Sequence, residues 1–451
     1  MIILGTNSIK DTGYNVDNSI RFDKNSSQSL SRTCGSSASS YTLSLWVKNC
    51  EPQGGDTTAI YWNGSGAKLN WEFNDHAQIY WYDPLTRTTA YYRDVSAWYH
   101  LVWSVSSNVG TLYINGSASP GLTNVSSIDS LNSSNQIYIG SDAGAYSPQN
   151  GYFSEVCFID GTALNATDFG EFDSDSPTIW KPKDVSALTF GSNGFYLDFK
   201  DSSALGNDVS GNNNDLTANS FSSLNQSTDT CTNNFCTMNP LDNYYASNTY
   251  SEGNIKFVTK ASGGFAYGTS TIGLSSGKWY AEFDCIATTD SGAYHQVGIV
   301  EKPSASTTTS ATANIGSSAY SWAYYAADGK SRNSASYSTY GDSWTTGNII
   351  GVYLNLDDNE LRFSKDGVIQ NSGTAISITA PASNGTGHYF ITAGGMSTNA
   401  SVTFEANFGN PFQSQSSSVS DANGYGAFEY SPTLSGVNYY SINTKNLAEF
   451  G

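Results

Sequence analysis

The chain is poor in charged residues and has no long apolar run. Only 13% of its 451 residues are Asp, Glu, Lys or Arg, well below the usual quarter, so long helices with Glu–Lys pairs are not expected. Lys and Arg number 20 against 39 acids, a formal net charge of −19. Because an acidic surface repels phosphate groups, neither nucleic acid nor an anionic membrane is an expected partner. No apolar run approaches the ~20 residues that span a bilayer, so no membrane insertion is expected.

Cysteine and histidine are scarce and scattered. The six cysteines are Cys34, Cys50, Cys157, Cys231, Cys236 and Cys285. They have no C-x-x-C spacing and no clustered histidines, so a zinc site is not expected. A Cys231–Cys236 pair and six free, buried thiols both remain open. The first residues, MIILGTNSIK, show no secretory signal, and we expect synthesis in a cytoplasm.

Aromatic residues and alternating patterns are what the sequence has instead. Tyr, Phe and Trp number 30, 21 and 10, enough to build hydrophobic cores. In YTLSLWVKNC, Leu43, Leu45 and Val47 fall on one face of a predicted strand. Residues 347–368, GNIIGVYLNLDDNELRFSKDGV, predict a three-stranded meander with a tight turn at Asp366-Gly367. The length predicts two or three domains, and the patterns predict an all-β protein.

Five segments between residues 20 and 165 carry a family resemblance. They are SIRFDKNSSQSLSRT, YTLSLWVK, SAWYHLVWSV, GTLYINGS and GYFSEVCFIDGTALNATDF. In this order they resemble the strands of a laminin-G-like, concanavalin A-type jelly roll. The resemblance implies a first module over residues 1–165, made of two stacked antiparallel sheets. Members of this family usually bind glycans or proteins, often with calcium at the rim.

A second set of segments resembles the landmarks of a SPRY domain. The segments are SSGKWYAEFDCIATTDSGAYHQVGIVE, WAYYAADGKSRN, YGDSWTTGNIIGVYLNLDDNELRFSKDGV and VTFEANFGNPF. The resemblance implies a second β-sandwich over residues 246–412, whose end loops bind peptides or glycans. This sequence departs from the family by inserting residues between Gly341-Asp342 and Ile349-Ile350-Gly351. The expected fold is therefore two antiparallel sandwich or jelly-roll modules, the first concanavalin A-like and the second SPRY-like.

The remaining parts of the chain are expected to be a joint and a tail. Residues 166–245 are rich in Asn and Asp, and we expect them to add a strand to the first sandwich or to cap it. Residues 413–451 are expected to pack along the protein as a C-terminal tail. One group of oxygen-bearing side chains in the joint could serve either of two purposes, an oxygen-ligand calcium site or plain Asx turns, and both alternatives stay open. Its spacing fits no EF-hand. The group consists of Asp201, Asp208, Asn212, Asn214 and Asp215. No other cofactor is expected.

No catalytic set is recognisable. The four histidines, which include His76 and His100, accompany no Gly-x-Ser-x-Gly elbow, and His100 is expected to be a packing residue. Glycoside hydrolysis, the weaker alternative, needs two or three suitably placed carboxylates. The nearest arrangements, Glu171 to Asp175 and Glu282 to Asp284, do not reproduce that set. We therefore expect a protein that is not an enzyme.

Exposed aromatic rings beside hydrogen-bonding side chains favour binding of sugar rings. In each alternating pair one ring is expected to lie in the core. The candidate ligand-binding residues are Tyr80, Trp81, Tyr82, Tyr91 and Tyr92 in the first module and Tyr294, Trp322, Tyr324 and Trp344 in the second.

Nearly the whole chain, up to the ending NTKNLAEFG, resembles structural proteins encoded by tailed phages of marine bacteria. The resemblance implies a virion surface protein, such as a tail fibre or appendage, made in the cytoplasm of the host bacterium. We expect it to bind a host-surface glycan or protein, with other virion proteins as partners. A homo-oligomer is expected, and a trimer is one form, although no heptad stretch imposes it. The alternative is a decoration protein that docks on capsid or tail subunits.

Overall fold

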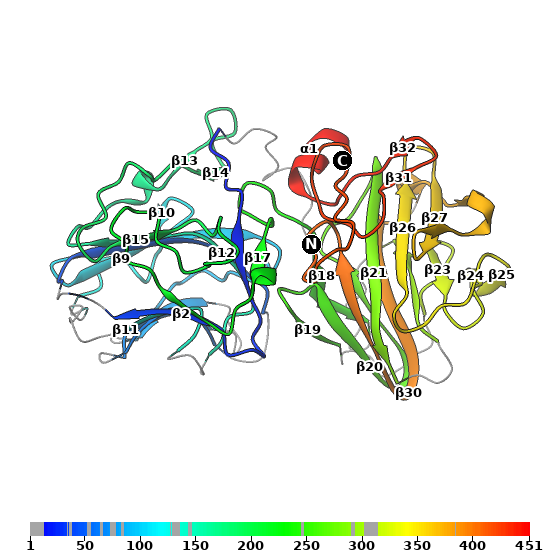
Figure 1. The fold of residues 1–451 in the computed structure, drawn as a ribbon, viewed down its shortest axis with the longest axis horizontal. Helices are drawn as coiled ribbons and strands as arrows, with labels where there is room; N and C mark the ends of the chain where they lie inside the picture. Colours follow the sequence, from blue (N-terminus) through cyan, green and yellow to red (C-terminus); the bar gives the residue numbers. More distant parts are fainter. Residues whose placement is uncertain are drawn as a thin grey trace. The chain divides into compact units, whose positions relative to one another are not determined.

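The computed structural model describes residues 13–33, 35, 38–51, 56–63, 66–72, 78–82, 85–126, 128, 136–142, 147–244, 248–289, 294–301, 314–383 and 385–451. The chain divides into two compact units, Asp11–Asn234 and Phe235–Gly451, called here the first and the second unit (Figure 1). Both consist of antiparallel sheets, which confirms the predicted all-β sandwich class. In the described part of the chain, no helix is long and apolar enough to cross a bilayer.

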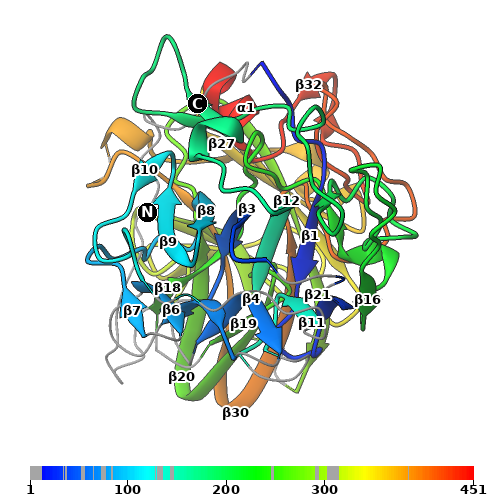
Figure 2. The same cartoon turned by 90° about the vertical axis from the view of Figure 1, so that its left-hand side faces the viewer.

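The first unit is a sandwich of two sheets. One sheet contains, in spatial order, β10 (Ser117–Ala118), β9 (Val109–Ile114), β8 (Trp98–Ser106), β3 (Tyr41–Asn49), β12 (Gly151–Asp160), β1 (Ser19–Phe22) and β17 (Gln226–Ser227). The other contains β16 (Thr217–Asn219), β2 (Ser29–Thr33), β11 (Gln136–Ile139), β4 (Thr57–Asn63), β5 (Lys68–Glu72), β6 (Gln78–Tyr82) and β7 (Thr86–Arg87). We call them the β3 sheet and the β4 sheet. Figure 2 shows β9, β8, β3, β12 and β1 of the β3 sheet in succession.

Period-two alternation builds the core between these sheets. Leu43, Leu45 and Val47 of β3 point inward, as predicted, and meet side chains such as Trp62 and Trp81 of the β4 sheet. All five are at most 1% exposed. Burial of such large side chains is the main favourable term that holds the two sheets together.

The chain after β12 adds strands to both sheets of the first unit. β15 (Phe195–Leu197) pairs with β12, β16 pairs with β2, and β17 pairs with β1. β13 (Gly170–Phe172) and β14 (Trp180–Pro182) form a separate hairpin. Residues 166–234, expected to be part of a joining segment, therefore belong to the first unit, and the boundary between units falls at residues 234 and 235.

The same segment covers the outer face of the β3 sheet. Phe169, Trp180 and Phe190 join a cluster with Trp46 and Tyr152, which point away from the main core. The aromatic residues on both faces of β3 and β12 therefore reflect packing on both sides of this sheet. Burial of these outward rings explains why the sequence places aromatic residues at both parities of these strands.

The second unit is held together by a bent pair of long strands. β20 (Lys256–Ser270) runs antiparallel to β30 (Phe390–Asn407), with irregularities in register near residues 260–264. The later half of β30 also pairs with β21 (Lys278–Thr288), and its earlier half pairs with β22 (Gln296–Val300). The pair is therefore shared by both layers of the sandwich, and Figure 1 shows it as two long strands running together. Bulges allow one strand to bend from one layer into the next.

The other strands extend the two layers from this pair. Beyond β21 follow β26 (Ile349–Asn355), β27 (Glu360–Lys365), β28 (Val368–Ile369) and β29 (Ile376–Ser377). Beyond β22 follow β23 (Ser321–Tyr325), β24 (Ser331–Asn333) and β25 (Ser336–Ser338). β18 (Met238–Tyr244) and β19 (Thr249–Ser251) pair with β20. The short 3-10 helices of the described residues are Ala166–Asp168, Ser223–Asn225, Asn371–Gly373 and Pro381–Ser383.

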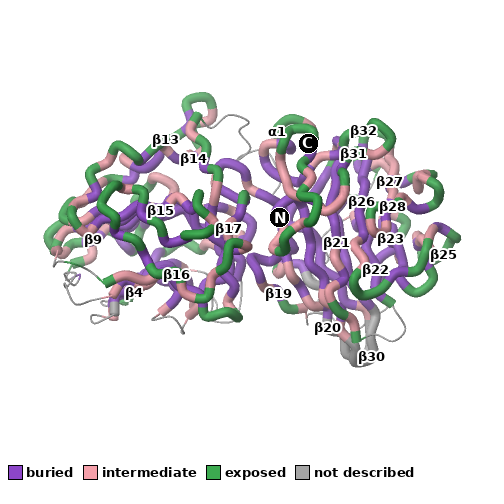
Figure 3. The backbone as a smooth tube through the Cα atoms, viewed as in Figure 1, coloured by how far each residue is buried: buried purple, intermediate pink, exposed green. Residues whose placement is uncertain are grey.

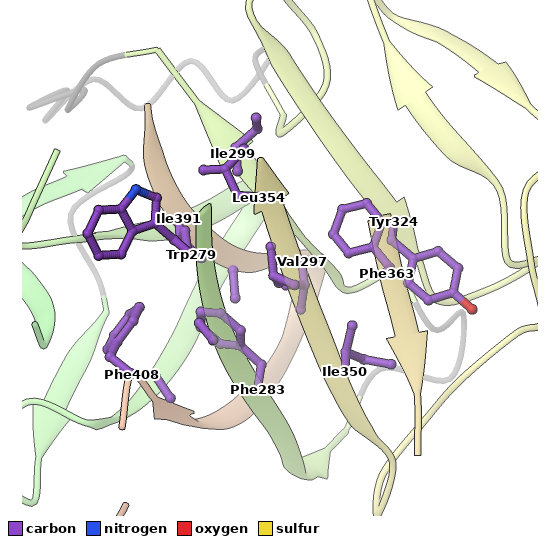
Figure 4. Packing of buried hydrophobic residues seen from close by; sticks show 14 of the residues in the cluster. Trp279, Phe283, Val297, Ile299, Tyr324, Ile350, Leu354, Phe363, Ile391 and Phe408 are labelled. Carbon is purple, nitrogen blue, oxygen red and sulfur yellow. The ribbon is translucent and has the colours of Figure 1, made fainter. Parts of the chain in front are cut away.

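The predicted meander is confirmed. β26 pairs with β27, and β27 pairs with β28 through the turn at Asp366-Gly367, whose φ angles are 48° and 77°. Ile350 and Leu354 of β26 enter the core, where they pack with rings such as Trp279 (Figure 4). The meander is thus scaffold for the second unit.

Residues 413–451 pack on the second unit. They contain the hairpin β31 (Thr433–Leu434) and β32 (Val437–Asn438) and the helix α1 (Thr444–Phe450). Leu447 of α1 belongs to the main core of this unit, and Phe428 packs on Tyr280 of β21 with ring centroids 4.9 Å apart. Asn443 caps α1 by accepting a hydrogen bond from the Asn446 amide.

Candidate ligand-binding surface

The outer face of the β4 sheet carries a row of tyrosines. Register places Tyr138 of β11 opposite Tyr61 of β4, Tyr61 opposite Lys68 of β5, and Lys68 opposite Tyr82 of β6. These four residues, which we call the tyrosine row, alternate with inward-facing side chains such as Ile60. The row therefore lies on the face that points away from the core.

The members of the tyrosine row touch one another and remain accessible. The ring centroids of Tyr61 and Tyr138 are 6.2 Å apart, and the Lys68 Nζ lies 5.4 Å from the Tyr82 centroid. The Lys68 ammonium also forms an ion pair of 2.9 Å with Asp142. Tyr82 is 48% exposed, and Tyr61 and Tyr138 are half-buried. The face combines aromatic rings with fixed charges, the composition that suits hydroxylated rings.

A second cross-strand row beside it contains polar groups that the protein leaves unpaired. Thr58, Asn70 and Tyr80 lie opposite one another on β4, β5 and β6. The Asn70 Nδ2 donates to the Tyr80 hydroxyl at 2.9 Å, and this hydroxyl donates to the Asp56 Oδ2 at 2.6 Å. Within the described residues, the buried Asp56 Oδ1, Thr58 Oγ1 and Asn70 Oδ1 have no hydrogen-bond partner. Three oxygens that lack partners are suited to receive hydrogen bonds from a hydroxylated molecule.

The predicted aromatic candidates of the first unit separate into core and surface residues. Trp81 is fully buried and stacks on Trp103 with centroids 4.6 Å apart. Tyr80 is only 4% exposed and acts through its hydroxyl. Tyr91 is 51% exposed beneath the Arg93 guanidinium, at 4.9 Å. Only rings with a free face can stack on a sugar, so Trp81 is corrected to a core residue.

Two further rings of the first unit complete this set. Tyr82 belongs to the tyrosine row. Tyr92 is half-buried and packs edge-on against Trp71 and Tyr99, with centroids 6.0 and 5.5 Å away. Of the predicted surface rings, only Tyr82 belongs to the tyrosine row. Tyr91 lies outside that row.

In the second unit, three of the four predicted rings are core residues. Trp322, Tyr324 and Trp344 are at most 5% exposed and belong to the main hydrophobic cluster. Tyr324 packs against Phe363 of β27 with ring centroids 5.5 Å apart, and Trp344 lies 6.0 Å from Tyr324. Tyr294 is the exception and is 41% exposed.

Comparison with known families matches the two units separately. The model described as the concanavalin A-like lectin/glucanases superfamily matches residues 22–168. The SPRY domain model matches residues 278–409. The chain contains a concanavalin A-like domain and a SPRY domain.

Solved structures with similarity to this chain include two SPRY domains and a toxin. The SPRY domain of human HERC1 has 19% identity and a TM-score of 0.31, covering 38% of this chain and 96% of that chain. A human SPRY domain has 19% identity and a TM-score of 0.25, covering 34% and 91%. Stonustoxin has 19% identity and a TM-score of 0.28, covering 38% and 27%. Curated proteins give no match.

Two members of the surface on the concanavalin A-like domain escape prediction from the sequence. Tyr61 and Tyr138 each sit between two inward-facing apolar residues, in AIYWN and QIYI. The sequence did contain one indication of their position. Both tyrosines alternate with apolar residues that face the core, namely Ile60, Trp62, Ile137 and Ile139, so they are expected on the outer face. The pairing of β11 with β4, which joins distant parts of the chain, brings the two rings together.

The loop that carries the calcium candidates is organised by hydrogen bonds. The Asp208 carboxylate accepts four, from the Tyr196, Ser210 and Asn214 amides and the Ser210 hydroxyl, at 2.8–2.9 Å. Asp201 accepts from Ser203, and Asp215 accepts from the Asp208 amide. This is the geometry of Asx turns. Across the described residues, no group of three or more His, Cys, Asp or Glu could hold a metal ion.

Two more of the candidates hold the same loop. Asn212 and Asn214 donate through their Nδ2 atoms to carbonyls of residues 191–194, at 2.7–3.0 Å. Their side chains thus fasten the loop to the chain before β15. These contacts use the amide donors of both side chains to hold the loop in place.

The titratable residues with unusual surroundings are packing groups. His100 lies between the Ser44 Oγ, at 2.9 Å, and the Trp180 Nε1, which donates to its Nδ1 at 3.0 Å. Burial lowers the pKa of His100 to about 3, so the imidazole is neutral. None of the cysteines of the described residues forms a disulfide, and Cys231 and Cys236 are therefore not joined. Cys34 and His76 lie outside the described residues.

The two acid pairs considered for hydrolysis occupy structural positions. Asp173 forms an ion pair of 3.2 Å with Lys181, in the β13–β14 hairpin. Glu282 is 2% exposed, and burial raises its pKa to about 7. Burial also raises the pKa of Asp284 to about 6, with Glu405 as a second cause. Glu282 accepts hydrogen bonds from the Glu429 and Tyr430 amides of the C-terminal residues, so these cover it.

Proposed function

We propose that this chain is a glycan-binding surface protein and that the tyrosine row of the concanavalin A-like domain is its binding surface. The main support for this proposal is that the outer faces of the two sheets differ in accessibility. The β3 sheet is covered on its outer face by residues 161–197, whereas the tyrosine row is accessible. Rings that stay accessible beside unpaired oxygens provide both stacking and hydrogen bonding to a sugar.

We also propose that the protein is displayed on a virion and meets glycans of the host surface. The resemblance of nearly the whole chain to structural proteins of tailed phages supports this proposal. Assembly into a homo-oligomer, such as a trimer, multiplies weak sites into useful avidity. The binding function needs no catalytic group, and the positions of Asp173 and Glu282 support a role without hydrolysis.

A glycan array probed with the purified chain tests this function. We expect binding to one class of bacterial surface polysaccharide, and we expect Tyr61→Ala to weaken it about 10-fold through loss of ring stacking. The matched control is Tyr425→Ala, which removes another half-buried tyrosine, whose ring centroid lies 5.8 Å from the Lys445 Nζ. Silence of the wild-type chain across host polysaccharides contradicts glycan binding.

The same samples decide between the remaining functions. If no glycan binds, location of the chain in virions by cryo-electron microscopy tests the decoration role, in which the tyrosine row is buried against a capsid or tail subunit. New reducing ends after incubation with a bound polysaccharide indicate hydrolysis. Their absence, together with binding, supports the non-enzymatic function.

A further inference from the structure

A buried arginine of the SPRY domain has no acidic partner among the residues that the structure describes. Arg332 of β24 is 9% exposed. Its Nη1 donates to the Ile315 carbonyl at 3.2 Å, and its Nε has no hydrogen-bond partner. No carboxylate of the described residues lies within ion-pair distance of it. A buried charge is unfavourable unless an opposite charge or hydrogen bonds compensate it.

Two other cations of the described residues have such partners. Lys48 is fully buried and forms an ion pair of 2.7 Å with Asp229. Arg362 of β27 pairs with Glu360 at 2.7 Å. The open Nε side is the side of a guanidinium that binds a carboxylate through two parallel hydrogen bonds. Arg332 is therefore prepared for an anion that the described residues do not supply.

Three tyrosines lie in a row beside this arginine, and we call them the tyrosine platform. The middle ring, Tyr325, is only 8% exposed, and its neighbours are tilted from it by 57° and 37°. Tyr337 of β25 lies opposite Arg332 in the sheet, and the guanidinium carbon is 5.3 Å from its ring centroid. Tyr325 is 5.5 Å from Tyr337, and Tyr294 is 6.2 Å from Tyr325. Tyr337 and Tyr294 are 47% and 41% exposed. Figure 3 shows β25 as an exposed strand, and it is the last strand of its layer.

Two amides near this platform also have unused hydrogen-bonding atoms. Gln296, opposite Tyr325 in the sheet, donates through its Nε2 to the Asn314 Oδ1. The Gln296 Oε1 and the Asn314 Nδ2 are buried and lack partners. Asn314 precedes Ile315, whose carbonyl accepts from Arg332. An acceptor, a donor and a cation therefore lie together at the platform, and each can serve a ligand.

We propose that Arg332, Asn314, Gln296 and the tyrosine platform bind an acidic saccharide. The carboxylate of a uronic acid type of sugar accepts hydrogen bonds from the Arg332 guanidinium and the Asn314 amide. A sugar hydroxyl donates to the Gln296 Oε1. Sugar rings of the same chain stack on Tyr337 and Tyr294, the two exposed rings of the platform. Two exposed aromatic rings beside hydrogen-bonding side chains can stack on the apolar faces of sugar rings, which favours a saccharide over an acidic peptide.

Titration calorimetry on the full chain tests this site. The probe is tetragalacturonic acid, and the comparison ligands are a neutral galactose tetrasaccharide, inorganic phosphate and tetraglutamate. We expect the acidic saccharide alone to bind well, with an affinity that falls as salt is added. We expect Arg332→Gln to weaken it about 10- to 100-fold, the effect of losing a charged hydrogen-bonding partner.

Two further variants separate binding from folding. Arg332→Lys keeps the charge but loses the paired donors, and Tyr337→Ala removes an exposed ring at the sheet edge; both are expected to bind more weakly while melting at nearly the wild-type temperature. Arg362→Gln is the matched control, because it removes one arginine of the same domain from another layer. Equal affinity of Arg332→Gln and wild type, absence of binding, or equal binding of the neutral saccharide overturns the proposal.

The comparison ligands settle the class of ligand. Phosphate that binds as tightly as the saccharide reduces the site to a simple anion site, and tetraglutamate that binds more tightly assigns it to acidic peptides; either result overturns the saccharide assignment. The site is independent of the tyrosine row. Tyr61→Ala therefore leaves this titration unchanged, and failure of one proposal does not imply failure of the other.

Discussion

Replacement of Glu155 by glutamine is expected to stabilise the first unit at high pH. Glu155 sits at the irregularity of β12 between its pairings with β1 and β15, with a φ of 49°. It is 6% exposed, and its Oε2 accepts hydrogen bonds from the Tyr196 and Tyr14 hydroxyls at 2.7 and 3.2 Å. Because one oxygen accepts both bonds, the amide oxygen of Glu155→Gln can keep them.

The size of the effect follows from the pKa of Glu155. Burial raises this pKa from 4.5 to about 7, against the lowering effect of the two hydroxyls. Between these pH values the folded protein binds more protons than the unfolded protein, so the free energy of unfolding falls as pH rises. The contribution is complete below pH 4.5 and is lost as pH passes 7. Each pKa unit corresponds to about 1.4 kcal/mol, so wild type loses about 3 kcal/mol that Glu155→Gln keeps.

Urea unfolding at pH 5 and pH 8 measures this difference. Hydrogen exchange of β12 peptides, read by mass spectrometry, assigns the transition to the first unit rather than to the SPRY domain. We expect Glu155→Gln to match wild type at pH 5 and to exceed it at pH 8. An unchanged pH dependence in the variant refutes the reasoning, because burial of this carboxylate would then not control it.

Three further changes have defined outcomes. Glu282→Gln should destabilise the SPRY domain by about 2–4 kcal/mol at neutral pH, since both carboxylate oxygens of Glu282 accept hydrogen bonds from buried donors and an amide nitrogen cannot. Calorimetric unfolding measures this loss, and an unchanged stability of the variant contradicts the prediction. Asp229→Ala should cost the first unit about 3–5 kcal/mol by leaving Lys48 buried without its partner, and urea unfolding should show part of that loss recovered when Lys48→Met is added. Chelation by EDTA should leave the melting temperature unchanged, because the Asp208 carboxylate is occupied by four hydrogen bonds; a calcium-dependent rise that Asp208→Ala abolishes speaks for metal binding.

Local alternation was sufficient to predict the meander of residues 347–368, and together with the family resemblances it predicted the fold class. Ile350 and Leu354 alternate with outward residues, and the turn at Asp366-Gly367 adopts the positive φ angles that its residue types predict. Such features depend on neighbours within a few residues. They are accordingly visible in one sequence and are retained in the structure.

The accessible aromatic rings could not be predicted in the same way. Trp46 and Tyr61 both alternate with core residues along their strands and therefore lie on the outer faces of their sheets. Trp46 is nevertheless buried, whereas Tyr61 remains accessible. The difference arises because Trp180 and its neighbours, more than a hundred residues along the chain, cover only one of the two sheets. Similarly, no local pattern reveals that Arg332 has no acidic partner among the described residues, since this depends on the whole set of strands around β24.

The late strands β16 and β17 have a consequence for synthesis of the chain. Ile20 of β1 pairs with Gln226 of β17, and Ser31 of β2 pairs with Thr217 of β16. At the ribosome these partners emerge about 200 residues after β1, roughly 10–40 s later at ordinary elongation rates. Until then, the early strands keep an open edge that can pair with another nascent chain. The first unit is therefore expected to depend on chaperones during translation, and to need them less once residue 234 has left the exit tunnel.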